Sequence, residues 1–436
     1  MRQVYRAGVP VASTQFDAAV SESHELVTVA EIMLNGVPVI GDLAVVGGSV
    51  QWDRRAATLA RCDIELMEPT RLPVDGGPLS PFGYEIRLSR GIRTRSASFG
   101  PPPDFDWLTD ENGNILTTPD GPLHVSNGAV LTQDGSPLVF DGSPITFGSV
   151  SPLPATLISS DVDVVFLGVF PIQRSSVDGV SLLTSIQAMD RSQRVRDARF
   201  EDDYSVAAGT NYATAIEALI ADGVPDLEYL FPTTNRTTPL LTFDAQSDRW
   251  ESAQGMARAL GHELFFDGLG RVVMRPEPSL ADGGFDVEFV EGEGGVLVDV
   301  SVELDRQPAY NRWVAFSENA ANDEVYRGVA TDDEPSSPTY YFGPFGKKPR
   351  FYSSPFIASD AQAQSAADSL KAASTGVARS LGLGVVPNPR VEPGDAALIR
   401  RAALGVDEIQ LVDEITMQLG PEGEMRCASR ARQVQS

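Results

Sequence analysis

The sequence predicts a mainly β protein with α+β modules, in which two β-rich parts flank a central α+β domain. Three observations support this class. Short apolar runs separated by turn signals fill both ends of the chain. Helical and strand patterns alternate between Ile186 and Pro278. Between Arg95 and Leu157, a segment rich in proline, glycine and aspartate interrupts the first β-rich part.

The central domain begins with two predicted helices. The first spans Thr210–Ala221, where apolar residues recur at helical spacing and Thr210 is expected to be the N-cap. The second spans about Asp248–Leu260, with Asp248 as N-cap and Gly261 at the position of a left-handed C-terminal residue. Both helices should place one apolar face against a shared core.

A β-hairpin is predicted directly after the second helix. Its strands are Glu263–Phe266 and Arg271–Arg275, and its turn lies at Asp267-Gly268. We expect the second helix to pack on this hairpin, with Trp250 and Phe265 in one core. The domain would then act as a rigid spacer between the two β-rich parts.

The first β-rich part reads as a barrel or a sandwich. Asn35-Gly36 lies between two apolar runs, which is the strongest short signal for a hairpin. Further alternating runs follow as far as Met189, with glycine-rich turns between them. The C-terminal part shows similar strands and one predicted helix, at residues 359–380, with capping-box spacing at its start.

The interrupting segment, residues 96–157, contains an internal repeat. Asp120-Gly121, Asn127-Gly128, Asp134-Gly135 and Asp141-Gly142 recur every seven residues. Two-residue turns at this spacing fit a meander of short hairpins. The alternative is a flexible low-complexity loop, and we favour the ordered arm. Its apolar face, a candidate interaction surface, would comprise Leu123, Val125, Leu131, Leu138, Phe140, Ile145 and Phe147.

This arm is expected to be an insertion between neighbouring strands of the first β-rich part. The flanking strands are predicted near Tyr84–Leu88 and Val164–Ile172, because strand patterning stops at Arg95 and resumes near Leu157. An insertion whose ends lie close together adds a modest loop-closure cost to its parent domain.

Charge and composition narrow the class of partner. The formal net charge is −26 at pH 7, so most of the surface should repel nucleic acid and anionic membranes. No stretch approaches the ~20 apolar residues of a membrane span, and no leader pattern opens the chain. We therefore expect assembly in a cytoplasm. Cys62 and Cys427 are expected to be buried free thiols, with a disulfide between the two β-rich ends as the alternative.

Motifs for catalysis or metal binding are not found. His24, His124 and His262 have no second ligand at metal spacing, and His262 follows a helix end as a structural residue would. The acidic runs 202–203 and 332–334 lack the spacing of a calcium loop. We therefore predict no catalytic residue, no cofactor site and no metal site.

Several longer runs carry a family resemblance. They resemble minor tail proteins of long-tailed phages of actinobacteria, a family similar to the baseplate hub proteins of phage tails. The runs are NGVPVIGDLAVVGGSV (Asn35–Val50), AMDRSQRVRDARF (Ala188–Phe200), AGTNYATAIEALI (Ala208–Ile220), ARALGHELFFDGLGRVVMRPEP (Ala257–Pro278), YYFGPFGKKPRFYSSP (Tyr340–Pro355) and VPNPRVEPGD (Val386–Asp395).

The resemblance implies two β-barrel hub domains on either side of the α+β domain. Their expected bounds are 1–180, with the arm inserted, and 286–436, with 181–285 between them. It further implies a homotrimer at the tail tip of a virion, which would present six similar barrels to a hexameric tail tube. Implied partners are tail-tube or distal ring proteins, other tip or fibre proteins, and the tape-measure protein in the channel.

The implied function is structural, without sequence-specific nucleic-acid binding or a membrane span. An acidic channel wall would not retain DNA in transit, because like charges repel. The alternative is a receptor- or carbohydrate-binding tip protein that acts through the arm. The arm holds few aromatic residues for stacking on sugars, which makes this alternative second. A cell-wall-degrading enzyme ranks third, since no motif nominates a catalytic pair.

Overall fold

The computed structural model describes most of the chain outside residues 94–161, and within that interval it describes six short strands. The described residues are 1–6, 9–11, 14–20, 25–41, 43–54, 56, 58–67, 77–93, 117–118, 121–122, 124–126, 129–131, 139–140, 143–144, 162–280, 283–292, 294–304, 306–307, 309–317, 325–354, 357, 359–374, 379–420 and 423–430.

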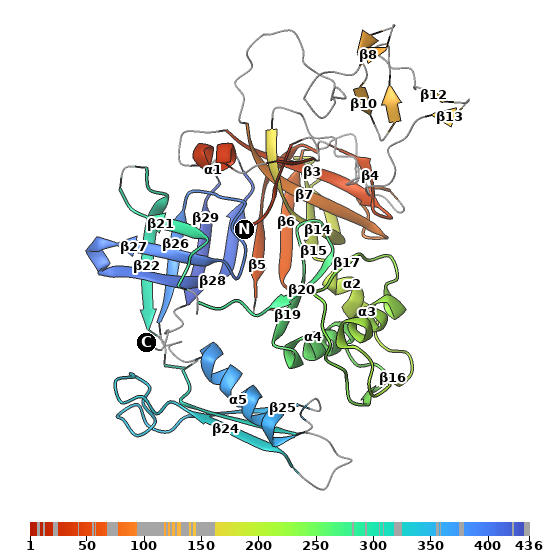
Figure 1. Ribbon diagram of the computed structural model, residues 1–436. Helices are drawn as coiled ribbons and strands as arrows, with labels where there is room; N and C mark the ends of the chain where they lie inside the picture. The colour runs from red at the N-terminus through yellow and green to blue at the C-terminus, as the bar shows by residue number, and fades with distance from the viewer. Residues whose placement is uncertain are drawn as a thin grey trace.

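One large, mostly antiparallel sheet organises the molecule (Figure 1). Its main path runs through eleven strands in the order β22 (Leu297–Leu304), β26 (Arg379–Val385), β29 (Met425–Arg430), β28 (Val406–Gln418), β5 (Val45–Asp53), β6 (Ala60–Leu66), β15 (Thr184–Met189), β14 (Val162–Val177), β7 (Tyr84–Arg93), β3 (Leu26–Leu34) and β4 (Val37–Ile40). Four more strands branch from this path, namely β1 (Val4–Arg6), β2 (Val9–Val11), β21 (Val287–Val290) and β27 (Ala396–Arg401). Helix α1 (Thr14–Val20) packs beside β7.

Strands from the N-terminal and C-terminal parts of the chain pair with each other inside this sheet. β5 pairs antiparallel with β28, from Asp53 opposite Glu414 to Ser49 opposite Gln418. Buried residues from both sides of this pairing, such as Ile64 and Leu383, belong to one hydrophobic cluster. The prediction of two separate barrels is therefore not confirmed. Among the described strands, the sheet is continuous, and no pairing closes either half into a barrel.

Local turn chemistry explains the first hairpin of the sheet. β3 and β4 are joined by Asn35 and Gly36, whose φ angles are 51° and 76°. Two consecutive positive φ angles match the twist of the flanking strands, which is why Asn-Gly is favoured at this position. The predicted hairpin is confirmed, with Leu34 opposite Val37.

The central α+β elements lie below the N-terminal half of the sheet (Figure 1). They comprise α2 (Ser192–Asp197), β16 (Tyr204–Val206), α3 (Tyr212–Gly223), β17 (Tyr229–Leu230), β18 (Leu241–Phe243), α4 (Arg249–Ala259), β19 (His262–Phe266) and β20 (Val272–Pro276). Their apolar side chains form a core of their own, separate from that of the sheet.

Both predicted helices of this region are present. Asp248 caps α4, since its side chain accepts a hydrogen bond from the Glu251 backbone nitrogen, and Gly261 has a φ of 74° after the helix. The cap of α3 is Asn211 and not Thr210, because the Asn211 side chain accepts from Ala213 and Thr214. An asparagine oxygen reaches the free N–H groups of the first turn as well as threonine does.

The packing of α4 on the following hairpin corrects one predicted contact. Trp250 is 1% exposed and packs against Phe266, with ring centroids 5.2 Å apart. The predicted partner, Phe265, points to the other face of β19, where the Arg275 guanidinium lies 4.6 Å from its ring. Adjacent residues of a strand face opposite sides, so an error of one position exchanges core and surface.

A small module lies below the C-terminal half of the sheet (Figure 1). It comprises β23 (Arg312–Ser317), β24 (Arg327–Thr331), β25 (Pro349–Ser354) and helix α5 (Asp360–Ser374). Ala315 and Ala330 of its sheet pack against Ala363 and Ala367 of α5. The predicted helix 359–380 is too long, because residues from Arg379 onward pair with β22 and β29 as strand β26.

The arm leaves and re-enters the sheet between two paired strands. β7 pairs with β14, and the pairing reaches Arg93 opposite Val162. The strands expected to flank the arm are therefore neighbours. Within the arm, the described strands form three separate hairpins, namely β8 (Thr117–Thr118) with β9 (Gly121–Pro122), β10 (His124–Ser126) with β11 (Ala129–Leu131), and β12 (Val139–Phe140) with β13 (Ser143–Pro144).

Two of these hairpins bracket predicted turns. Ser126 pairs with Ala129 across Asn127-Gly128, and Phe140 pairs with Ser143 across Asp141-Gly142. The first hairpin is offset by one residue, because Gly121 belongs to β9 and pairs with Thr118. The described strands are two or three residues long, shorter than the five that the repeat predicts. No pairing between the hairpins joins them into one meander among these strands.

The core position of Trp250 yields the first testable prediction. Trp250→Ala should lower the free energy of unfolding by about 3–5 kcal/mol, because it removes a fully buried ring that packs on Phe266. Phe265→Ala is the matched control on the other face of β19 and should cost less. Urea denaturation followed by circular dichroism measures both. Equal costs for Phe265→Ala and Phe266→Ala would contradict the register of β19.

Candidate functional site

The most developed polar site lies where the large sheet meets α4 and the hairpin β19–β20. A cavity of about 290 Å³ opens there. Its walls come from the end of β5, from the hairpin, and from the turn before β27. The charged and aromatic residues used below are Arg2, Trp52, Arg54, Glu263, Phe265, Arg275, Glu277, Glu392 and Asp413. We call this set the charged junction.

Arg54 is the centre of the charged junction. Its Nη2 lies 2.6 Å from Glu263 and 3.3 Å from Glu277, and its Nη1 lies 3.4 Å from Asp413. The Arg54 side chain is 9% exposed and that of Asp413 is 1% exposed. Burial acts to lower the pKa of the Arg54 guanidinium, but attraction to the three carboxylates outweighs it and raises the pKa above its ordinary value.

Glu263 is shared between two arginines. It faces Arg275 across the hairpin, because the two residues are register partners of β19 and β20, and Arg275 Nε lies 2.6 Å from the carboxylate. Arg275 also donates to the Pro393 carbonyl oxygen at 2.9 Å. The hairpin is thus tied to β5 through Arg54 and to the turn before β27 through Arg275.

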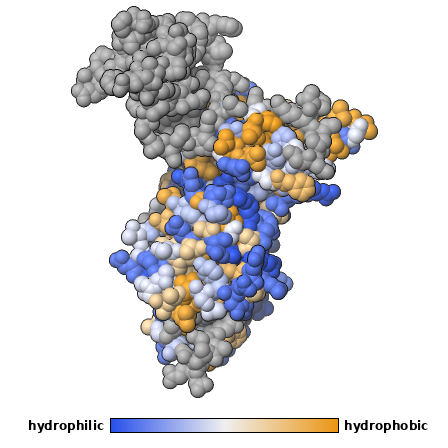
Figure 2. All heavy atoms as spheres, turned by 90° about the vertical axis from the view of Figure 1, so that its right-hand side faces the viewer, coloured by the Kyte–Doolittle hydropathy of each residue, from blue (hydrophilic) through white to orange (hydrophobic). Residues whose placement is uncertain are grey.

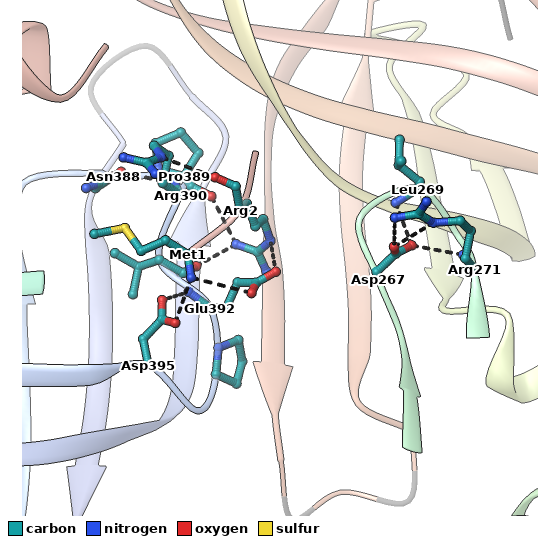
Figure 3. A network of polar contacts seen from close by, with 12 residues as sticks. Met1, Arg2, Asp267, Leu269, Arg271, Asn388, Pro389, Arg390, Glu392 and Asp395 are labelled. Atoms are coloured by element: carbon teal, nitrogen blue, oxygen red, sulfur yellow. Dashed lines mark hydrogen bonds and ion pairs between the residues drawn. The ribbon is translucent and has the colours of Figure 1, made fainter. Parts of the chain in front are cut away.

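The N-terminal segment lies against the turn before β27, with Arg2 beside Pro389, Arg390 and Glu392 (Figure 3). Arg2 Nη1 donates to the carbonyl oxygens of Pro389 and Val391 at 3.0 and 2.6 Å, and the guanidinium lies 4.4 Å from the Trp52 ring centre. Glu392 lies 3.7 Å from Arg2 Nε. Burial lowers the pKa of Arg2, and the nearby carboxylates oppose that effect only in part.

Two further acidic residues, Asp395 and Asp267, make contacts near this segment. The Met1 backbone nitrogen lies 2.9 Å from Asp395, and burial raises the pKa of Asp395 although the Met1 ammonium opposes the shift. Nearby, Asp267 holds the turn of the hairpin, since its side chain accepts from the Leu269 and Arg271 backbone nitrogens (Figure 3). Together these contacts fix the relative positions of the hairpin, β5 and the C-terminal strands.

The charged junction acts as a structural brace, because its ion pairs connect the hairpin to the large sheet. Glu263 is held between two guanidiniums, so both of its carboxylate oxygens are engaged in ion pairs within the protein. His262 beside it places Nδ1 3.0 Å from the Leu260 carbonyl oxygen, which confirms its structural role. In the described part of the chain, no group of three or more His, Cys, Asp or Glu is placed to hold a metal ion.

The candidate interaction residues of the arm are placed only in part. Val125, Leu131 and Phe140 lie in β10, β11 and β12. Leu123, Leu138, Ile145 and Phe147 lie outside the described residues, and so do the side chains of all seven. The proposed apolar face of the arm therefore stays a prediction.

The two cysteines lie in the core of the sheet. Cys62 in β6 and Cys427 in β29 are both buried and free, which confirms the first of the two interpretations. Burial raises the pKa of the Cys427 thiol to about 12 and that of Cys62 further. Thiols with such raised pKa values stay protonated and unreactive at neutral pH.

A second candidate surface is apolar and lies at one end of the large sheet. It gathers exposed side chains from the β3–β4 hairpin, from the ends of β5, β6 and β14, and from the turns before β7 and β15. They are Val37, Val39, Val46, Met67, Phe82, Val177, Val180 and Leu182. Figure 2 shows apolar side chains concentrated on the upper part of the face nearest to β3 and β4, above a hydrophilic band. Exposed apolar patches of this kind mark contact surfaces.

No protein-family model matches the chain, and no curated protein sequence matches it. Its fold is similar to that of two solved tail proteins. The tail protein from Neisseria meningitidis MC58 superimposes with a TM-score of 0.53 and 11% identity, over 93% of this chain and 96% of that one. The 43 kDa tail protein of prophage MuSo2 from Shewanella oneidensis gives a TM-score of 0.52 and 11% identity, over 93% and 98%.

The similarity therefore extends over nearly the whole of all three chains. At this identity the similarity establishes the fold alone. In the described part of the chain, no helix is both long and apolar enough to cross a membrane.

The charged junction yields the second prediction. Arg54→Met should destabilise the protein by about 3–5 kcal/mol, because the buried Asp413 would lose this cation and Glu263 would keep only Arg275. Arg400→Met is the matched control, since Arg400 pairs with Asp407 at an exposed position and should change stability by less than about 1 kcal/mol. Urea denaturation midpoints measure both. A near-neutral Arg54→Met would show that the junction is not a brace.

Proposed function

We propose that this chain is a structural protein of a phage tail tip, a baseplate hub component that closes or adapts the tail tube. In this role it anchors tip proteins around the channel through which DNA leaves. The observation that supports the proposal is the similarity of fold, over nearly the full length, to two phage tail proteins. The sequence resemblance to minor tail proteins of actinobacteriophages suggests the same role.

The internal organisation suits a structural component better than a catalyst. A continuous sheet joins both ends of the chain, and a buried ionic brace fixes the α+β elements to it. Within the proposal, the segments 1–180, 181–285 and 286–436 are the first hub domain, the spacer and the second hub domain. The two hub domains would then be open halves of one sheet.

The proposed partners follow from this role. We propose a homotrimer in the virion that contacts the tail-tube or distal ring proteins above it, the fibre and tip proteins around it, and the tape-measure protein in its channel. The apolar end of the sheet offers one surface for such a neighbour. The net charge of −26 fits a channel that must release DNA, since phosphate repulsion opposes its retention.

Oligomeric state in the particle gives the third prediction. Three copies should surround the channel of the assembled tail tip, because a trimer is the symmetry that the hub role implies. Cryo-electron microscopy of purified tails, with the chain located by a fused tag, measures the copy number and symmetry. A two-fold ring or a dimer at the tip would contradict the proposal.

Deletion of the arm gives the fourth prediction. A chain in which residues 101–154 are replaced by a short glycine linker should fold with a nearly unchanged melting temperature, because Arg93 and Val162 are already strand partners. Phage that carry the deletion should fail in assembly or adsorption, because the arm's partner surface is lost. Calorimetry and complementation of infection measure these outcomes.

The same deletion separates the proposal from its alternative. Normal tails that do not adsorb would favour a receptor-binding arm. Tails that do not assemble would favour a contact with another tip subunit. An unfolded deletion protein, or normal infection, would show that the arm has been misplaced or has no essential role.

A further inference from the structure

All three lysines of the chain lie in the small module around α5. They are Lys347, Lys348 and Lys371, in a chain with 34 basic and 60 acidic residues. Two of them belong to Tyr340–Phe351, which we call the basic segment. Residues 335–359, which contain it, include no Asp or Glu. A local positive surface is therefore set into a strongly acidic protein.

The cations of the basic segment lie over aromatic rings. Lys347 Nζ is 5.2 Å from the centre of the Tyr341 ring, and Lys348 and Arg350 are 5.1 and 5.7 Å from that of Tyr310. The described residues place no carboxylate within ion-pair distance of Lys347, Lys348 or Arg350, whereas Lys371 pairs with Asp333 at 3.3 Å. Lys348 Nζ also donates to the carbonyl oxygens of Arg306 and Gln307 at 3.0 and 2.6 Å, and Arg350 lines the cavity at the charged junction. Lys347 has neither kind of contact within the described part of the chain, and a ring holds a cation in position without neutralising its charge, so the charge of Lys347 in particular remains available to a partner.

Exposed rings accompany these charges. Phe342 and Phe351 are 69% and 66% exposed. They are not needed to close the module's own core, since α5 covers the sheet through alanines on the face that Ala315 and Ala330 share. Aromatic side chains beside arginine or lysine are enriched in protein interfaces, where the rings supply buried area and the cations supply charge complementarity.

Charge complementarity indicates the partner. Polyanions such as DNA are poor candidates, because three cations neutralise few phosphates and the remaining surface is repulsive. A protein surface that is acidic fits the small size of the patch. Another copy of this chain carries such a surface, with a net charge of −26, and the proposed trimer brings copies together.

We propose that the basic segment docks on an acidic surface of a second copy of this chain, with Phe342 covered in the contact. This inference rests on the proposed homotrimer. The two contacting surfaces differ, so the contact is head-to-tail, the type that closes a ring around a rotation axis. Repulsion between acidic copies would thereby be offset at one defined place in each interface.

The scarcity of lysine makes this contact directly testable. A zero-length carbodiimide couples an amine to a carboxylate only where the two touch. Unlabelled and nitrogen-15-labelled chains are mixed, assembled alone or with neighbouring tail proteins, coupled, digested and read by mass spectrometry. We expect Lys347 to be joined to an Asp or Glu in peptides of mixed isotope. Lys371 joined to Asp333 within one chain is the internal control.

Charge reversal provides the second arm of the experiment. Lys347→Glu with Arg350→Glu should weaken self-association by about tenfold or more, because acidic side chains would then face an acidic surface. Arg400→Glu with Arg426→Glu is the matched control, with the same change of charge at exposed positions on the C-terminal strands. Sedimentation of the assembled species measures association, and melting temperatures verify folding in both variants.

The failures of the two proposals can be told apart. A trimer that forms without mixed-isotope coupling at Lys347, and that survives the double reversal, overturns the docking inference and leaves the hub proposal intact. Absence of any self-association in the particle overturns both. Binding of a duplex oligonucleotide or of phosphatidylglycerol vesicles at about 150 mM salt, lost in the double reversal, would assign the segment to a polyanion instead.

Discussion

The pairing of β5 with β28 is the constraint on which the rest of the structure depends. It joins strands that are about 360 residues apart in sequence, from Asp53 opposite Glu414 onward. Without it the two sheet halves would each present a long unpaired edge, which invites association with other chains. With it they share one core, so a load on either half is transmitted through a close-packed interior.

The charged junction sits beside this pairing and has a different effect. Arg54, directly after β5, and Arg275 hold Glu263 of the hairpin between them, and Arg54 also pairs with Asp413 in β28. A hydrophobic contact would tolerate sliding, whereas these short charge-assisted hydrogen bonds allow one geometry. The junction therefore sets the angle at which the α+β elements leave the sheet. In the proposed hub, that angle determines how the spacer meets its neighbours.

The sequence predicts those features that are encoded locally. The Asn35-Gly36 turn, the Asp248 cap and the hairpin after α4 follow from residues within one or two turns of each other. The register of β19 was harder, because Phe265 and Phe266 are both apolar and only packing against Trp250 separates them. The sequence predicts two barrels, whereas the structure has one open sheet. Strands that pair across the whole chain carry no local sequence signal of their pairing.

The charged junction was missed for the same reason, with one exception. The pair Glu263 and Arg275 follows from the hairpin register, and opposite charges facing each other across a hairpin are a signal that a sequence can give. The other charged residues of the junction are Arg54, Glu392 and Asp413. They lie in segments whose sequences carry no pattern that connects them to the hairpin.

The position of Arg2 affects when the chain can fold during its synthesis. Its guanidinium is buried against carbonyl oxygens of Pro389 and Val391, which are synthesised about 390 residues after it. At ribosomal rates of ~5–20 residues per second, about 390 residues take roughly 20–80 s. Throughout that interval the first segment has no place to bind, and β5 has an open edge. The sheet can therefore close only after β28 has been synthesised, so a chain that terminates before β28 leaves the edge of β5 unpaired.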